Sequence, residues 1–246
     1  MLRAIRRELP HEDLLYVGDS GCAPYGDRPA AFVTERAMVM TNFLIEQGAK
    51  AVVVACNTAT AVSVNTLRQR FNIPVVAIEP AVKLAASRTR SRVVGVLATT
   101  GTASSPNMAK LLADYGSDVE FLIQPCPGLA DQVEKGELSS DETRTMVQRY
   151  VRPLTDKGAD ILVLGCTHYP FLRPLIEEIA GPAVEVIDPA TAVARELRRR
   201  LDTGGLLHDT TDSGSEQFWT TGAVDEVAPI VRQLWGKSVR VSRLSV

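Results

Sequence analysis

The feature that most constrains the fold of this chain is an internal repeat. The segment "EQGAKAVVVACNTAT" (46–60) resembles "DKGADILVLGCTHYP" (156–170). A glycine, an alanine and a cysteine recur with one spacing of 110 residues, as from Cys56 to Cys166. Further along, "IEPA" (78–81) matches "IDPA" (187–190) with one residue deleted. An ordered series at one spacing indicates a duplicated fold, so we expect two related halves.

The pattern of hydrophobic residues predicts the α/β class, because short β-branched runs alternate with helical patterns. Strands without apolar–polar alternation are typical of parallel sheets that are covered by helices on both faces. The predicted strands are 14–18, 51–55, 74–78, 92–98, 119–123, 161–165 and 184–187. The predicted helices are 2–9, 29–47, 59–71, 80–89, 105–115, 140–157, 170–180 and 189–202. A surface loop (203–217), a short strand (218–221), a helix (223–235) and an edge strand (239–244) are expected to follow.

The repeat also predicts two domains. We expect residues 1–79 plus 189–246 to form one three-layer α/β domain and residues 80–188 to form the other. In open parallel sheets, ligands bind beyond the carboxyl ends of the strands, where Cys56 and Cys166 are expected. If the halves face each other about a pseudo-twofold axis, one cleft receives a cysteine from each side.

Composition excludes several classes of protein. A net charge of −2 gives no basic excess for binding nucleic acid or a membrane surface. No apolar run approaches the roughly 20 residues that a membrane-spanning helix needs. The four cysteines lack tight CxxC pairing and the three histidines are scattered, so neither a metal site nor a disulfide framework is predicted. The Arg-rich start contains acidic residues and precedes no apolar signal core, so we expect a cytoplasmic protein with reduced thiols.

Two thiols on opposite faces of a substrate carbon form a matched base and acid. A thiol titrates near ~8.5 when unperturbed, so modest help from polar neighbours yields a thiolate at neutral pH. The thiolate removes a proton from one face and the thiol returns one to the other face. This two-base racemisation needs no metal and no pyridoxal lysine, and we see no clear motif for either.

The motifs "VACNTAT" (54–60), "GCTHYP" (165–170) and "GDSxxxPYG" (18–26) resemble those of glutamate racemases, in the aspartate/glutamate racemase superfamily. The resemblance covers nearly the whole chain. It implies two α/β domains and a cofactor-independent interconversion of L- and D-glutamate that supplies D-glutamate for peptidoglycan. The implied partner is the small-molecule substrate glutamate, and a homodimer stays open.

The resemblance also implies roles for residues at matching positions. The implied acid/base residues are Cys56 and Cys166, with His168 and Glu134 assisting Cys166. The implied substrate-binding residues are Tyr25, Gly26, Asn57, Thr58, Thr99, Thr102 and Thr167. Packing is the preferred interpretation of Cys126, and a small loop residue that of Cys22.

One departure from the family pattern concerns the beginning of the chain. Family members begin with a strand ending in Asp-Ser-Gly, whereas this chain begins at the helix 2–9. We therefore expect much reduced activity, and an open apolar face on that helix that favours self-association. Two alternatives stay open: a catalytically silent relative that binds a protein, and a racemase acting on aspartate or a hydantoin.

Overall fold

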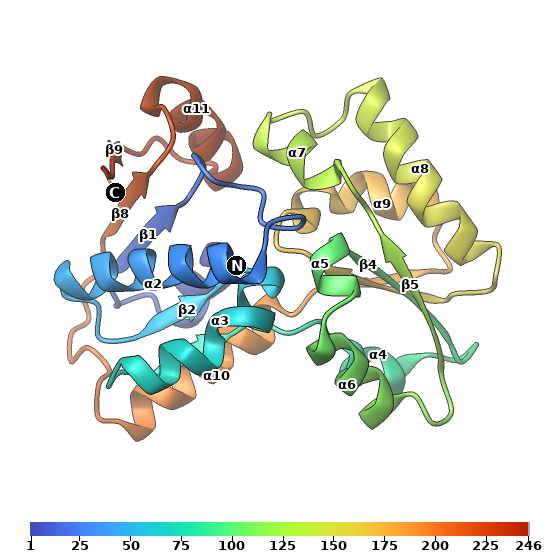
Figure 1. The fold of residues 1–246 in the computed structure, drawn as a ribbon, viewed down its shortest axis with the longest axis horizontal. Coiled ribbons are helices and arrows are strands. Elements are labelled where there is room, and N and C mark those ends of the chain that lie inside the picture. The colour runs from blue at the N-terminus through green and yellow to red at the C-terminus, as the bar shows by residue number, and fades with distance from the viewer. Residues whose placement is uncertain (246) are drawn as a thin grey trace. The chain divides into compact units, whose positions relative to one another are not determined.

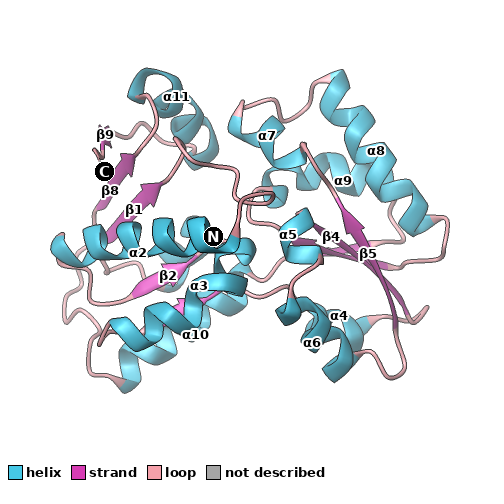
Figure 2. Cartoon of the chain, in the orientation of Figure 1, coloured by secondary structure: helices cyan, strands magenta, loops and turns pink. Residues whose placement is uncertain are grey.

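The computed structural model describes residues 1–245 and divides into two compact units. Unit 1 contains Met1–Ile78 together with the chain from Ala190 onward, and unit 2 contains Glu79–Pro189. All strand pairs in both units are parallel, and helices alternate with the strands along the chain. The predicted α/β class is therefore confirmed (Figures 1 and 2).

Unit 2 is built on one four-stranded sheet. Its strand order is β5 (Glu120–Pro125), β4 (Val93–Ala98), β6 (Ile161–Gly165) and β7 (Glu185–Ile187). Every residue of β6 is buried, as a continuous apolar run in a parallel sheet predicts. Helices α4 (Val82–Arg88) and α6 (Pro106–Tyr115) lie on one face, and α8 (Asp141–Thr155) and α9 (Arg173–Ala180) on the other (Figure 1).

Unit 1 contains two separate sheets among the described residues. One has the order β1 (Leu14–Gly18), β8 (Glu216–Thr220) and β9 (Val241–Arg243), and the other pairs β2 (Val52–Val54) with β3 (Val75–Ala77). The remaining elements of unit 1 are α1 (Leu2–Glu8), α2 (Ala30–Glu46), α3 (Asn57–Arg70), α10 (Ala190–Thr203) and α11 (Val224–Trp235). In unit 2, β4 joins β5 to β6, whereas β1 and β2 are not hydrogen-bonded to each other within the described sheets.

The apolar face of α1 is closed. Ala4 and Ile5 are only 6% and 5% exposed, and they share a buried cluster with Val193 and Leu197 of α10. Leu14 of β1 belongs to the same cluster. The expectation of an open face on this helix is therefore wrong, because α10 of the same unit covers it.

The sequence repeat corresponds to a repeated local structure. Gly48 and Gly158 have φ angles of +87° and +88°, in the left-handed region where glycine is favoured. Ala49 N–H donates to the Leu44 carbonyl, and Ala159 N–H donates to the Leu154 carbonyl. Each pair ends the turn before β2 or β6, so the same backbone geometry leads into both of the strands that precede the cysteines.

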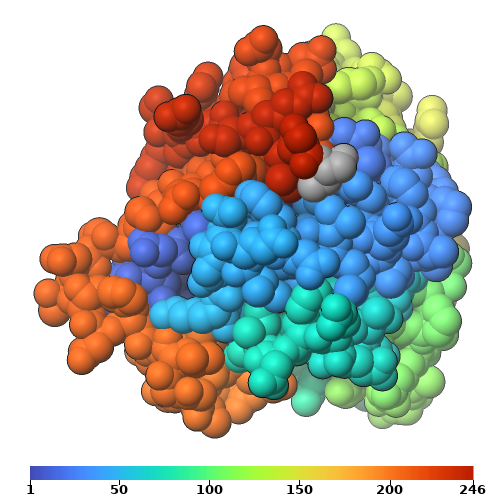
Figure 3. Space-filling model, turned by 60° about the vertical axis from the view of Figure 1, so that its left-hand side comes forward, coloured from blue at the N-terminus to red at the C-terminus, as the bar shows by residue number. Residues whose placement is uncertain are grey.

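The main differences from the predicted elements are short helices and strands that are only partly buried, such as β1 and β5. The helices α5 (Thr100–Ala103) and α7 (Leu129–Glu134) and the 3-10 helix η1 (Tyr169–Leu172) are additional. Strand β1 is not buried on both faces, because Tyr16 is 37% exposed. The polar segment before β8 is an exposed loop, visible as an orange projection in Figure 3. No described helix is long and apolar enough to cross a membrane.

Candidate active site

In unit 1, Cys56 lies between the end of β2 and the start of α3. Its backbone is extended, with φ −137° and ψ 120°, and it is the N-cap residue of the 14-residue helix. The backbone N–H of Ala59 donates to the Cys56 Sγ at 3.4 Å. The positive end of the helix macrodipole favours an anion at such a position. The half-buried thiol therefore lies where a thiolate is stabilised.

Asn57 begins α3 and carries an unsatisfied amide. Its side-chain oxygen and nitrogen are both buried, and neither has a hydrogen-bond partner among the described residues. Leaving such a buried polar group unpaired costs about 1–3 kcal/mol. The neighbouring Thr58 is also buried, with 6% exposure. A polar ligand at this helix terminus would satisfy the Asn57 amide.

Tyr25 and Gly26 lie in the loop that joins β1 to α2. The Tyr25 ring packs with Cys56 against one apolar cluster that includes Val33 and Val54. Its hydroxyl donates to the Asp19 carboxylate. Burial raises the pKa of Tyr25, and the hydrogen bond to Asp19 raises it further. Two predicted site residues of unit 1, Tyr25 and Cys56, are thus brought to one cluster.

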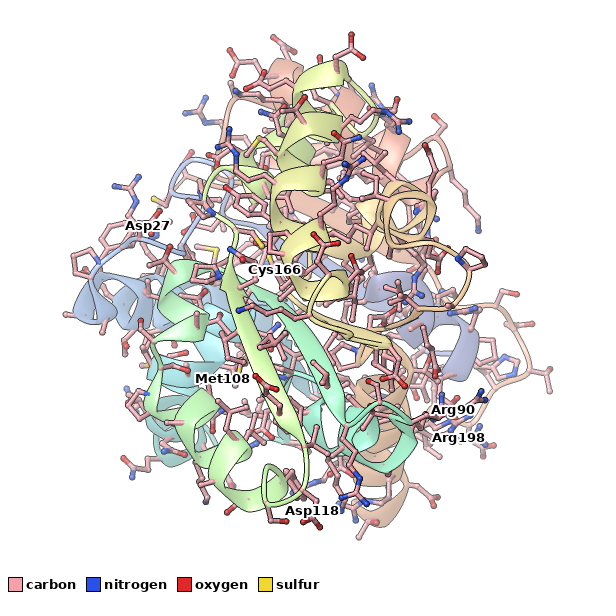
Figure 4. The ribbon with its side chains drawn as sticks, turned by 90° about the vertical axis from the view of Figure 1, so that its right-hand side faces the viewer. Asp27, Arg90, Met108, Asp118, Cys166 and Arg198 are labelled. Carbon is pink, nitrogen blue, oxygen red and sulfur yellow. The ribbon has the colours of Figure 1, made fainter. Side chains whose placement is uncertain are left out.

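In unit 2, Cys166 follows the last residue of β6. The strand ends Ala98 and Gly165 are paired in register, so Thr99 and Cys166 both lie just beyond the same edge of the sheet. Figure 4 shows Cys166 at one end of the strands and Asp118 near the other end. Cys166 is 7% exposed. Its position repeats that of Cys56 after β2.

His168 links Cys166 to Glu134. The His168 Nδ1 atom lies 3.6 Å from the Cys166 Sγ, and Nε2 lies 2.6 Å from the Glu134 Oε1. Burial lowers the pKa of His168, but the interactions with Cys166 and Glu134 outweigh it and raise the pKa well above the ordinary value. The imidazole side chain is 26% exposed, so solvent screens part of this effect. The three side chains form a relay in which an imidazolium lies beside the thiol.

The three predicted threonines of unit 2 lie around the same strand ends. The Thr99 hydroxyl caps α5 by accepting from the Thr102 N–H at 3.2 Å, and it donates to the Thr102 hydroxyl at 3.0 Å. Thr102 is buried, and Thr167, which follows Cys166, is half-buried. The residues predicted for unit 2 therefore share one edge of its sheet.

The other cysteines differ in their surroundings. Cys126 is 2% exposed and its thiol donates to the Gln124 carbonyl, which confirms its packing role. Burial raises the pKa of the Cys126 thiol, so it stays protonated. Cys22 is half-buried in the loop after β1. Within residues 1–245 no group of three or more His, Cys, Asp or Glu side chains is arranged to hold a metal ion.

Gly165 is required by the close approach of two strands. A Cβ atom at this position would lie 2.9 Å from the Leu97 carbonyl oxygen, which is backbone and cannot move aside. We expect Gly165→Ala to lower the free energy of unfolding by about 1–3 kcal/mol, as overpacking does. The matched control is Gly18→Ala at the end of β1, whose Cβ would meet only side-chain atoms, of Tyr16 at 3.2 Å and of Ser20 at 3.5 Å. Urea denaturation of both variants tests this, and equal losses of stability would contradict it.

Comparison with known proteins identifies the family. Residues 1–197 match the family described as Asp/Glu/Hydantoin racemase. The chain belongs to this racemase family. A glutamate racemase from Methylococcus capsulatus is 48% identical over 244 residues, which cover 99% of this chain and 90% of the relative. The protein is accordingly an amino-acid racemase, an isomerase.

Solved structures of other racemases share the fold. Glutamate racemase isoform RacE1 from Bacillus anthracis is 33% identical, with a TM-score of 0.90, over 100% of this chain and 92% of that chain. Escherichia coli glutamate racemase, in complex with L-glutamate and the activator UDP-MurNAc-ala, is 28% identical. Its TM-score is 0.87, over 100% of this racemase and 93% of that chain.

Some residues around the site were not among those predicted. Asp19, Arg36 and Thr221 form a partly buried polar cluster that is hydrogen-bonded to Tyr25 through Asp19. Asp19 lies within the quoted "GDSxxxPYG" motif, which is a signal that could have identified it. Thr221 lies about two hundred residues away in the sequence, so no local pattern connects it to the site.

Proposed function

We propose that this racemase interconverts L- and D-glutamate, with Cys56 and Cys166 as the two acid/base residues. The observation that carries the proposal is the equivalent placement of the two thiols. Each follows a parallel strand that is preceded by the same left-handed glycine turn, at Gly48 or Gly158. Ligands of open parallel sheets bind at this edge. The two units are, in this proposal, the two racemase domains.

The proposed reaction transfers one proton at each face of the α-carbon. The Cys166 thiolate removes the α-proton, and the electron pair of the C–H bond passes into the α-carboxylate. The Cys56 thiol then gives its proton to the opposite face, which leaves Cys166 protonated and Cys56 as a thiolate. The enantiomer is released, and the exchanged protonation states catalyse the reverse reaction.

The relay in unit 2 supports the role of Cys166. An imidazolium at His168 is held by the Glu134 carboxylate and stabilises a thiolate 3.6 Å away. After Cys166 takes the α-proton, the His168 imidazolium lies beside a neutral thiol instead of a thiolate. The relay therefore places its positive charge beside the residue that acts as the base.

The helix terminus in unit 1 supports the binding of a carboxylate. The buried Asn57 amide has no partner in the described part of the chain, and α3 presents its N–H groups there. Both features suit the α-carboxylate, whose negative charge increases as the proton leaves. We propose that Thr58 and Thr167 add short polar contacts to the substrate, as do Tyr25, Gly26, Thr99 and Thr102.

Glutamate is the proposed substrate because the relatives that match over the full chain are glutamate racemases and the Escherichia coli relative binds L-glutamate. We propose that the D-glutamate formed supplies peptidoglycan synthesis. Aspartate is the second candidate substrate, because the matching family includes racemases for both amino acids.

The interrupted sheet of unit 1 is expected to limit the activity of the 246-residue chain. Strands β1 and β2 are not joined by a pairing in the described sheets, although β4 joins their counterparts in unit 2. Cys56 follows β2, so its position depends on this less connected half of the unit. We propose a turnover number below that of the relatives, which side-by-side assays with the Methylococcus capsulatus enzyme would measure.

Solvent exchange tests the proposed function. The protein is incubated with L-glutamate in deuterated water, and α-deuterium uptake and optical rotation are followed together. Two-base racemisation predicts that deuterium enters as the rotation decays to zero, because the proton is returned by a different group. L-Aspartate serves as the matched control substrate. If the folded protein gave no deuterium uptake and no decay of optical rotation with L-glutamate, the proposal would be contradicted.

A further inference from the structure

Outside the relay of Cys166, His168 and Glu134, the side chain of Asp19 is a buried charge with several hydrogen-bond partners. Its side chain is only 6% exposed. Arg36 of α2 donates two hydrogen bonds, from Nε to Oδ2 at 2.9 Å and from Nη2 to Oδ1 at 2.7 Å. Thr221 donates its hydroxyl to Oδ1 at 2.6 Å, and Tyr25 donates its hydroxyl to Oδ2. One carboxylate thus accepts from three different parts of unit 1.

These contacts tie the loop after β1 to the strand beside it. Gly18 and Thr220 are paired at the ends of β1 and β8, so Asp19 and Thr221 lie next to each other. The Thr221 hydroxyl also accepts from the Gly21 N–H, and the Asp19 carbonyl accepts from the N–H groups of Cys22 and Ala23. The loop is therefore fixed at its start by both the backbone and the side chain of Asp19.

The carboxylate is ionised in this setting. Burial raises the pKa of Asp19, but the hydrogen bonds from Arg36, Thr221 and Tyr25 together lower it below its ordinary value. A charged acceptor makes stronger hydrogen bonds than a neutral one. The only hydrogen of the Tyr25 hydroxyl is directed at Asp19, which fixes the torsion of the phenol as well as the ring position.

We propose that Asp19 is a positioning residue, which holds Tyr25 against the apolar cluster that also contains Cys56. This inference rests on the proposed function, because it assigns Tyr25 to substrate binding. Asp19 itself does not contact the reacting atoms. Its effect passes through Tyr25, while Arg36 balances its charge and Thr221 anchors it to β8.

The test compares Asp19→Asn with the parent in steady-state racemisation of glutamate. An asparagine cannot accept from all the donors and places an NH₂ group against the Arg36 guanidinium. A loosened Tyr25 weakens substrate binding, so we expect KM to rise about tenfold, in line with loss of a charged hydrogen bond, while kcat changes less than about threefold. Partial unfolding alone would lower kcat and leave KM unchanged.

The matched control is Asp13→Asn at the other end of β1. Asp13 also accepts two hydrogen bonds, from the backbone N–H and the hydroxyl of Ser215, and Ser215 does not belong to the candidate site. Its replacement should leave KM within about twofold of the parent value. Thr221→Val keeps the side-chain shape and removes one donor, so it provides a milder version if Asp19→Asn does not fold.

A second readout is independent of activity. Tyr25 in the parent resists ionisation, whereas in Asp19→Asn its pKa should fall, because the hydrogen bond to the carboxylate is lost, and stay above the ordinary tyrosine value, because burial remains. Ultraviolet titration of tyrosinate absorbance measures this pKa. The tyrosinate absorbance that Asp19→Asn gains over the parent should be absent from the double variant Asp19→Asn/Tyr25→Phe. If glutamate is not racemised by the parent, the proposed function fails but this titration still tests the positioning. A folded Asp19→Asn or Thr221→Val protein with unchanged KM and unchanged tyrosine titration would overturn the inference.

Discussion

Replacing Cys166 or Cys56 with alanine is expected to abolish racemisation, with a loss of at least about a thousandfold in kcat. The reaction needs one group to remove the α-proton and another to supply one on the opposite face. Each single variant retains one thiol, which still removes and returns hydrogen on its own face. We therefore expect slow α-deuterium exchange without inversion, on opposite enantiomers for the two variants. Mass spectrometry of separated L- and D-glutamate measures both outcomes.

Cys22→Ser is the matched control for this pair of variants. Cys22 lies in the same unit as Cys56 and is also half-buried, but it lies in the loop between β1 and α2 and caps no helix. Its replacement should leave kcat within about twofold, as for most substitutions outside a site. A Cys56 or Cys166 variant with full racemase activity would remove that cysteine from the mechanism.

The second large effect is expected at His168. Substituting asparagine removes the imidazolium beside Cys166, so we expect kcat/KM to fall by about a hundredfold, a typical contribution of a positioned acid or base. L- and D-glutamate have equal free energies in solution, so kcat/KM must fall equally in both directions. Polarimetry started from each enantiomer checks the size of the loss and this equality.

Glu134→Gln tests the same relay through its pH dependence. Because the pKa of His168 is raised, the imidazole stays protonated at pH values above the ordinary histidine pKa. The activity that depends on the imidazolium is therefore lost only as the pH rises through the raised pKa. Removing the Glu134 charge lowers the pKa of His168, since that carboxylate is one of the groups that raise it. The alkaline decline in kcat should therefore move to lower pH in Glu134→Gln. An unchanged pH profile would mean that Glu134 does not act through His168.

Much of the fold could be predicted from local sequence patterns. Strand β6 was predicted at its observed boundaries because a fully buried parallel strand is a continuous apolar run. The 110-residue spacing predicts two related halves, and Gly48 and Gly158 share one left-handed conformation. Helix α7 was missed because it has only six residues and begins after a left-handed Gly128, without a side-chain cap. The exposure of Tyr16 depends on which strands pair with β1, and a local pattern does not contain that information.

The candidate site was predicted in part for similar reasons. Cys56 and Cys166 stand out because they repeat in register and follow strands, which are local properties. The contact of His168 with Glu134 joins residues 34 positions apart, and it was inferred from the resemblance to the family. Asp19 was overlooked because its importance lies in its partners, Arg36 and Thr221, which only the folded chain brings together.

The insertion of unit 2 into unit 1 has a consequence for biosynthesis. All four strands of the unit 2 sheet lie between Glu79 and Pro189, so the complete set leaves the ribosome before β8 does. Strand β1 emerges early but pairs with β8, whose residues appear about two hundred codons later. The nascent chain can therefore close unit 2 while β1 still lacks its neighbour. Cotranslational folding would thus begin in the middle of the gene product, with the Cys166 side of the enzyme formed first.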